Sequence, residues 1–248
     1  MRSDRPIREL TLVYAGVAGA TVLITRFEEV PPLSDYVHLG VGLLFLVVAI
    51  VLAQREPDGM RRHGLDLEGL LDPPPEDDRA GPLGLRDLGR SLRRAVPAGF
   101  AELGWATLLA LIIFPPFTLG FFLYNQPAHP FVFEVPQDTA SFVVAQVLVV
   151  GLPEEALFRG YFQTRLGDLW PRRRTLLRVS TSLPALVTQA VLFACIHFLV
   201  DLNPARLAVF FPGLLFGWVR TWRGGIGAAI FLHALSNVYA DFLVRGWL

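Results

Sequence analysis

The sequence predicts an all-α protein, a polytopic transmembrane bundle of about seven to eight helices around a cavity within the membrane. Hydrophobic residues make up 53% of its 248 residues and charged residues only 18%, against about 25% charged in an average soluble domain. The apolar residues gather in runs that approach the roughly 20 helical residues needed to cross a bilayer. Almost all arginines lie outside these runs, as expected for a membrane protein.

Composition excludes several other classes. The 22 basic and 22 acidic residues cancel, and no basic face interleaved with aromatics is present, so a nucleic-acid partner is not expected. Every basic residue is Arg and none is Lys, a bias that indicates a GC-rich bacterial genome. The single cysteine, Cys195, excludes an intramolecular disulfide and a cysteine-based zinc site.

Seven apolar runs are candidate spans: 10–24, 37–53, 99–124, 140–158, 183–200, 207–219 and 225–244. The first follows three arginines, but its small residues lie inside the run, which favours an uncleaved first span over a signal peptide. Pro115 and Pro116 interrupt the third run and are expected to kink or end that helix.

The runs divide the chain into three parts. Residues 1–53 form an N-terminal transmembrane hairpin, and residues 54–98 form a cytoplasmic linker. The linker contains a proline-rich acidic stretch at 72–78, expected to be extended or disordered. An amphipathic helix at 85–94 follows it, suited to the anionic inner leaflet. Residues 99–248 form a transmembrane bundle, with all the motifs described below inside 140–244.

The arginines predict the orientation. If the N-terminus is cytoplasmic and all seven runs cross, 18 arginines lie inside and three outside, while Arg159 lies at the end of the fourth run. Cytoplasmic loops carry the excess of basic residues. We therefore expect a multi-pass protein of the bacterial cytoplasmic (inner) membrane, with the lipid bilayer as its surroundings and a cytoplasmic N-terminus.

The fourth run carries three ionisable residues, Glu154, Glu155 and Arg159. A charge near mid-bilayer costs at least about 2.5–3.5 kcal/mol on insertion scales, so such residues pair, line water or do chemistry. Glu155 and Arg159 are four apart and can form an ion pair on one helix face. Glu154 lies about 100° around the helix without a local partner. A desolvated carboxylate of this kind can act as a general base or acid.

Two further runs carry polar groups. The fifth contains Phe193 and His197, and the seventh contains His233 and Asn237, which are four apart and share a helix face. A lone histidine in a helix is usually a core residue whose hydrogen bonds are made. Here, however, the two histidines, the asparagine and the two glutamates are spread over three apolar helices. If they converge, Glu154 could deprotonate a water that one imidazole holds, while His or Asn stabilises an oxyanion. These are the components of a hydrolase that works inside a membrane.

Convergence requires a long fourth helix. With strict alternation of short helices, Glu154 would lie near the inner face and His197 near the outer face. A single helix over roughly 141–166 would start nearer the outer surface and bring Glu154 to mid-membrane.

The three motifs together resemble the CPBP family of CAAX-processing and bacteriocin-processing intramembrane proteases, also called Abi or Rce1-like. The motifs are Glu-Glu-x-x-x-Arg (Glu154, Glu155, Arg159), Phe-x-x-x-His (Phe193, His197) and His-x-x-x-Asn (His233, Asn237). They occur in the family's order, and Gly160 and Tyr161 also fit its usual continuation.

The resemblance implies an all-α intramembrane endopeptidase without a cofactor. It implies that Glu154 activates the hydrolytic water, that His197 helps to position it, and that His233 and Asn237 form the oxyanion site. Glu155 and Arg159, with Phe193, would support the architecture. Zinc remains an alternative, since Glu154, His197 and His233 would be a legitimate three-ligand set, although no H-E-x-x-H pair is present to seed a site.

The expected substrate is a membrane-associated protein or peptide, cut near its C-terminus or membrane anchor. Bacterial relatives are linked to bacteriocin or peptide maturation, to immunity, and to removal of C-terminal sorting helices in a myxosortase-like branch. Two alternatives stay open. One is a non-catalytic membrane scaffold or bacteriocin-immunity protein that keeps the fold. The other is a small proton-coupled transporter with a Glu/His relay, although no related halves are evident in the sequence.

Overall fold

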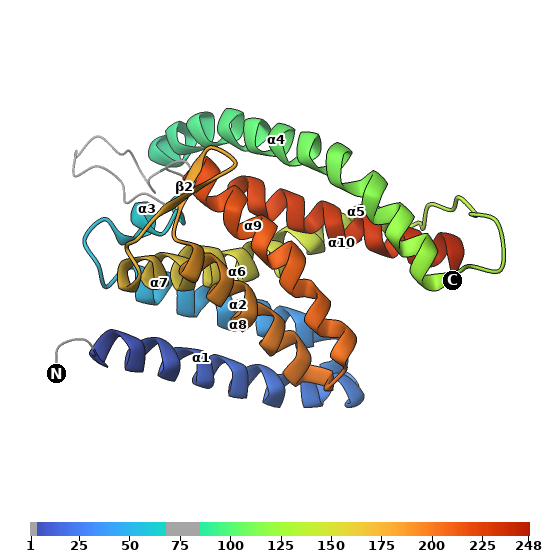
Figure 1. The fold of residues 1–248 in the computed structure, drawn as a ribbon, viewed down its shortest axis with the longest axis horizontal. Coiled ribbons are helices and arrows are strands. Elements are labelled where there is room, and N and C mark those ends of the chain that lie inside the picture. The colour runs from blue at the N-terminus through green and yellow to red at the C-terminus, as the bar shows by residue number, and fades with distance from the viewer. Residues whose placement is uncertain (1–3, 68–84) are drawn as a thin grey trace.

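The computed structural model describes residues 4–67 and 85–248, and it is helical over most of them (Figure 1). The elements of the N-terminal part are α1 (Asp4–Thr25), the 3₁₀ segments Arg26–Glu29 and Leu33–Tyr36, α2 (Val37–Ala53) and α3 (Gly59–Arg62). Those that follow are α4 (Leu85–Asn125), α5 (Thr139–Ala145), α6 (Leu152–Glu155), α7 (Gln163–Leu169), the hairpin strands β1 (Arg174–Leu176) and β2 (Val179–Thr181), α8 (Leu183–Asp201), the 3₁₀ segment Pro204–Val209, α9 (Phe210–Arg223) and α10 (Gly227–Trp247).

Among the described residues, six helical stretches are long and apolar enough to cross a membrane, which confirms the all-α, multi-pass prediction. They are Pro6–Glu29, Leu33–Ala53, Ser91–Asn125, Thr139–Leu169, Leu183–Asp201 and Gly227–Trp247. The predicted sixth run, 207–219, is shorter than these spans. Its first residues are 3₁₀-helical, and α9 has only 14 residues, about 21 Å of helix. Helix α9 packs against α8 and α10.

Helix α4 differs from the expected division into a linker helix and a third span. It runs without a break from Leu85 to Asn125, so the segment 85–94 and the apolar run 99–124 form one helix of 41 residues. Pro115 and Pro116 do not end it. Pro115 and Pro116 are exposed, whereas the neighbouring Phe114 stacks on Tyr239 of α10. Prolines are tolerated in membrane helices where neighbouring helices and local adjustments satisfy the freed backbone groups. The acidic stretch expected at 72–78 lies outside the described residues.

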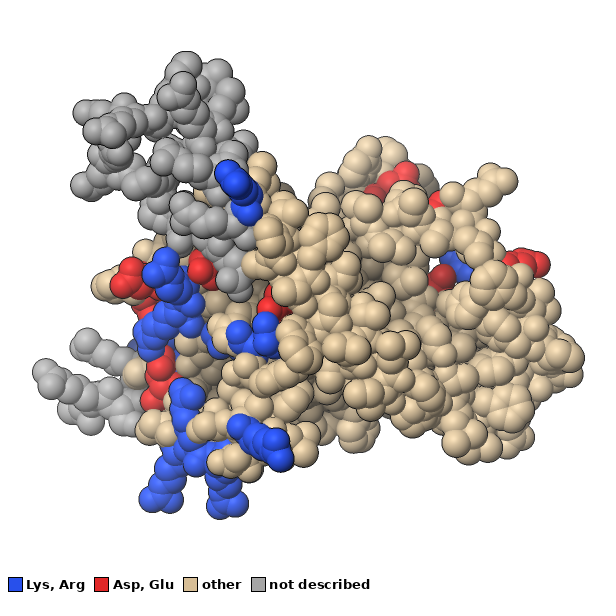
Figure 2. Space-filling view, turned by 90° about the horizontal axis from the view of Figure 1, so that it is seen from above, with Lys and Arg blue, Asp and Glu red and all other residues tan. Residues whose placement is uncertain are grey.

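Charge is distributed along the long axis of the molecule. Figure 2 shows arginine side chains gathered at one end, with an almost uncharged surface beyond them. We call this the Arg-rich end; its described arginines are Arg8, Arg55, Arg61, Arg62, Arg165, Arg172, Arg173, Arg174, Arg178, Arg220 and Arg223. Large apolar side chains are exposed on the middle of the bundle, for example Leu111 at 67% and Ile112 at 70%. Glu155, Arg159 and His233 are buried instead, as expected where lipid is the solvent.

The central helix is continuous over Thr139–Leu169, slightly longer than the predicted 141–166. Two π-helical segments, Gln146–Gly151 and Ala156–Phe162, flank α6 within it. Pro153 lacks the N–H that an α-helix would bond to the carbonyl four residues earlier, and this favours a wider turn there. Glu154 lies halfway along the helix, fifteen residues from either end. That position places its carboxylate near mid-membrane.

Helix α2 packs closely against the central helix because Gly42 has no side chain. A Cβ atom added at Gly42 would lie 2.5 Å from the carbonyl oxygen of Val149 and 3.4 Å from Pro153. A Cβ atom at Gly40, one half-turn earlier, would make only an ordinary 3.5 Å contact with Ile24. Gly42 therefore sets how closely the N-terminal hairpin approaches the helix that carries Glu154.

We expect Gly42→Ala to destabilise the protein and Gly40→Ala to leave it stable. The first substitution forces two helices apart, at a cost of about 1–3 kcal/mol typical of overpacking. The second removes a flexible glycine from a helix and should gain about 0.5–1 kcal/mol. Thermal unfolding of the purified variants in one detergent measures both effects. Equal melting temperatures for the two variants would contradict this account of the contact.

Candidate active site

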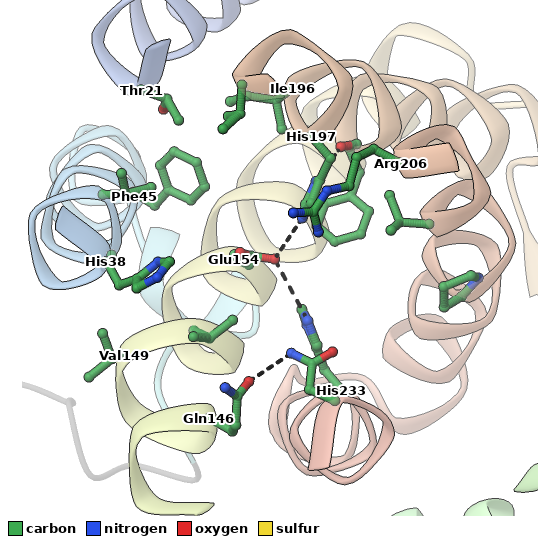
Figure 3. A pocket seen from close by; sticks show the side chains of 18 of the residues that line it. Thr21, His38, Phe45, Gln146, Val149, Glu154, Ile196, His197, Arg206 and His233 are labelled. Atoms are coloured by element: carbon green, nitrogen blue, oxygen red, sulfur yellow. Dashed lines mark hydrogen bonds and ion pairs between the residues drawn. The ribbon is translucent and has the colours of Figure 1, made fainter. Parts of the chain in front are cut away.

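The structure brings the four predicted catalytic side chains together from three helices (Figure 3). Glu154 comes from α6, His197 from the C-terminal part of α8, and His233 and Asn237 from successive turns of α10. The Nε2 atom of His197 lies 3.9 Å from Glu154 Oε2, and the Nε2 atom of His233 lies 3.7 Å from the same oxygen. Short alternating helices would have held Glu154 and His197 at opposite faces of the membrane. The central helix is instead long enough to bring Glu154 to the level of His197.

The other ring nitrogens of both histidines are occupied. His197 Nδ1 donates to the carbonyl oxygen of Phe193 at 2.8 Å, one helical turn earlier. His233 Nδ1 donates to Glu155 Oε1, also at 2.8 Å. A neutral imidazole carries one N–H, so each ring in its neutral form presents an Nε2 lone pair towards Glu154. The hydrogen bond to Phe193 thus sets which nitrogen of His197 faces the site, and the hydrogen bond to Glu155 does the same for His233.

A buried ion pair lies behind this cluster. Arg159 Nη1 is 3.0 Å from Glu155 Oε1, and both side chains have zero exposure. Arg159 Nη2 also donates to the carbonyl oxygen of Gly213 in α9, at 3.4 Å. Glu155 therefore pairs with Arg159 and accepts a hydrogen bond from His233, and the pair links the central helix to α9 and α10. The predicted i,i+4 pair is confirmed, and it supports the position of His233.

Aromatic rings enclose the same cation. The guanidinium carbon of Arg159 lies 4.1 Å from the ring centroid of Phe193 and 5.3 Å from that of Phe216. Cation–π contacts of this kind gain strength when the cation is desolvated. Phe216 also stacks on His233, with ring centroids 5.0 Å apart and 21° between the planes. Phe193 is the supporting aromatic expected from its motif, whereas Phe216 lies outside the three motifs.

Gln146 is a polar neighbour of the site that the sequence analysis did not identify. Its Oε1 atom accepts a hydrogen bond from Asn237 Nδ2 at 2.8 Å (Figure 3). It lies eight residues before Glu154 in the same apolar run, a spacing close to two helical turns. A search for polar residues at helical spacing from Glu154 would have found it. The contact fixes the orientation of the Asn237 amide and leaves its second N–H directed elsewhere.

A cavity of about 530 Å³ contains these groups. Its walls come from both the N-terminal hairpin and the C-terminal bundle, with Thr21, His38 and Phe45 on one side and Ile196 and Phe216 on the other. The walls are mainly apolar, and the polar groups converge on Glu154. Such a cavity suits an apolar ligand with one polar bond placed at the centre.

We expect Arg159→Met to destabilise the protein strongly, because it leaves Glu155 as an unpaired buried charge. Breaking a buried pair in this way costs about 3–5 kcal/mol. The matched control is Arg245→Met, which breaks another i,i+4 pair, Arg245 to Asp241 at 2.7 Å, with the arginine side chain 52% exposed. Unfolding titrations in mixed micelles should show a large loss of unfolding free energy for Arg159→Met and no resolvable loss for Arg245→Met. Similar losses for both would mean that burial of the pair is not what stabilises the site.

No curated protein and no solved structure matches the chain significantly. A protein-family profile described as "Type II CAAX prenyl endopeptidase Rce1-like" matches residues 136–239. The match contains Glu154, Arg159, His197, His233 and Asn237. Over residues 136–239 the chain is thus similar to the Rce1-like family of type II CAAX prenyl endopeptidases.

Proposed function

We propose that the protein is an intramembrane endopeptidase in which Glu154 activates the attacking water. The observation that carries this proposal is the convergence of Glu154, His197 and His233 at 3.7–3.9 Å in a cavity within the bundle. These distances are too long for direct hydrogen bonds. One water lying beside Glu154 Oε2 and His197 Nε2 would donate a proton to each, which orients its oxygen lone pair away from both acceptors.

In the proposed reaction the water oxygen attacks the carbonyl carbon of the substrate amide while Glu154 takes a proton from it. The carbonyl π pair moves to oxygen and forms the oxyanion of a tetrahedral intermediate. Collapse of this intermediate breaks the C–N bond, and Glu154 returns the proton to the leaving nitrogen. The products are a carboxylic acid and an amine, and Glu154 ends in its starting form.

The oxyanion would be stabilised by Asn237 and His233. Asn237 has a second amide N–H beyond the one that Gln146 accepts. His233 can donate from Nε2 only as an imidazolium, and the carboxylate of Glu155 at 2.8 Å from its Nδ1 supports that charge. With His233 protonated, two carboxylates, Arg159 and His233 sum to zero charge.

We propose further that the reaction needs no metal. Glu154, His197 and His233 are the conceivable zinc set, but their donor atoms lie wider apart than the roughly 3.4 Å between ligands of a tetrahedral ion with bonds of about 2.0–2.1 Å. Within 4–67 and 85–248, no group of three or more His, Cys, Asp or Glu side chains is arranged to hold a metal ion. The substrate would be a membrane-associated protein or peptide.

We expect Glu154→Gln to abolish proteolysis and Glu134→Gln to leave it intact. Both substitutions exchange a carboxylate for a nearly isosteric amide, but Glu134 is exposed in the loop between α4 and α5. Loss of a general base typically lowers the rate by about 10²–10⁴-fold. Comparison of the C-terminal peptides of membrane and exported proteins, in cells that carry each variant at the native locus, measures the effect. Proteins that keep an extra C-terminal segment only in the Glu154→Gln strain are the substrates.

The same experiment decides between the proposed function and its alternatives. If the two variants and the parent give identical peptide profiles while deletion of the gene still changes the cells, catalysis by Glu154 is wrong. The scaffold or transport function would then replace it, and proton-coupled uptake into vesicles would separate those two.

Chelation provides a separate test of the metal-free reaction. We expect the purified protein to cleave its substrate at an unchanged rate after dialysis against a strong zinc chelator, because no step needs a Lewis acid. Loss of activity that zinc restores, together with about one bound zinc per chain by elemental analysis, would establish the three-ligand site instead. Glu154→Gln serves as the background for residual activity.

A further inference from the structure

The cavity reaches the surface at the end of the bundle opposite the Arg-rich end. Its outer lining contains Glu28 after α1, His38 in the first turn of α2, Asp201 at the end of α8, and Arg206 in the following 3₁₀ segment. In Figure 3, His38 and Arg206 lie on opposite sides of Glu154. All four residues belong to helix ends or connections on the same side of the membrane-spanning bundle.

The Arg-rich end is closed beneath the site. The loop after α2 packs on the central helix at Gly160, where a Cβ atom would lie 2.6 Å from a methyl group of Leu65. His63 has no exposed surface; its Nδ1 atom donates to the carbonyl oxygen of Gly160 at 3.1 Å, and its ring stacks on Tyr161. Burial lowers the pKa of His63, which favours the neutral ring in this contact.

Ion pairs hold this closure in place. Arg62 contacts Glu56 and lies 2.6 Å from Asp168 at the end of the central helix. Arg165 binds Glu56 at 2.9 Å. Arg220 from α9 donates to the carbonyl oxygen of Arg62 at 3.1 Å. The loop is thereby linked to two other helices. Within the described residues, none of the side chains of this network lines the cavity that contains Glu154.

The two ends differ in charge in a way that assigns them to sides of the membrane. Within the described residues, the closed end carries the arginines of the Arg-rich end, whereas the connections at the open end carry three arginines together with six acidic residues. An excess of arginine marks the cytoplasmic side. We infer that the cavity opens to the non-cytoplasmic side of the membrane, and that the segment bound there comes from a translocated protein.

This inference deepens the proposed function, on which its substrate class rests. A CAAX-type enzyme that opened to the cytoplasm would receive the C-termini of cytoplasmic proteins. A site open on the other side receives segments that have already crossed the membrane. The cavity wall between the opening and Glu154 is apolar, with Phe45, Phe142 and Ile196 among its residues. It therefore suits the outer end of a membrane anchor, with the bond to be cut lying within the outer half of the bilayer.

Cysteine accessibility tests the direction of opening without relying on catalysis. The background is Cys195→Ser, which removes the single native cysteine. Single cysteines are then placed at the opening (Glu28→Cys and His38→Cys), deeper in the cavity (Ser236→Cys) and at the Arg-rich end (Arg172→Cys). Right-side-out and inverted membrane vesicles are treated with a small, charged, membrane-impermeant thiol reagent. The labelled fraction of each variant is measured by mass spectrometry.

We expect both opening positions to be labelled in right-side-out vesicles and to lose labelling in inverted ones. Arg172→Cys should show the reverse pattern. Ser236→Cys should follow the opening positions, at a lower rate, because the reagent reaches it only through the cavity. Labelling of the opening positions, or of Ser236→Cys, only in inverted vesicles would overturn the inference.

Failure of the proposed chemistry would be seen separately. Addition of Glu154→Gln to each cysteine variant should abolish proteolysis and leave the labelling pattern unchanged. An active enzyme labelled from the cytoplasmic side would overturn the direction of opening while retaining the peptidase. If the labelling pattern is as expected but the parent protein cleaves nothing, the peptidase function is wrong, and the substrate class with it. The direction of opening would still hold.

Discussion

The site depends on one interaction, the buried ion pair between Glu155 and Arg159. Neither charge could remain in the apolar bundle alone, because an unpaired ion there loses its solvation without compensation. Together they form a neutral unit that accepts a hydrogen bond from His233, donates to the carbonyl of Gly213 and sits against two aromatic rings. The pair thus joins three helices at the level where Glu154 must meet its partners.

The backbone geometry of the central helix also positions the site. The central helix places adjacent glutamates on different faces, so one can pair with arginine while the other faces the cavity. The π-helical segments on either side of α6 have wider turns than an α-helix. They therefore change which residues before and after the two glutamates face the neighbouring helices. Gly42 lets α2 approach this irregular stretch closely. Charge neutralisation and close backbone packing therefore act on the same few turns of helix.

Sequence patterns predicted the parts of this arrangement that depend on local spacing. Residues four apart share a helix face, and this rule was sufficient for the pair of Glu155 and Arg159. The motifs on three apolar runs also indicated which side chains would meet. The pattern did not predict the contact of Gln146 with Asn237, which joins residues 91 positions apart, nor the fusion of the linker helix with the third span. The short run 207–219 begins as a 3₁₀ segment and continues as α9, which returns from the open end at Arg206 to the Arg-rich end at Arg220. Hydropathy did not predict where this helix begins, because it records only how apolar a run is.

The N-terminal hairpin has a consequence for how this kind of enzyme can diversify. The segment matched by the family profile, residues 136–239, carries every group proposed to act on the substrate bond. Thr21, His38 and Phe45, which form the facing wall of the cavity, lie outside it. One wall of the cavity thus comes from a different stretch of the chain than the chemistry. A change in α1 or α2 can alter which side chains the cavity accepts without moving a catalytic atom, so exchange of hairpins between relatives is a natural route to new substrates.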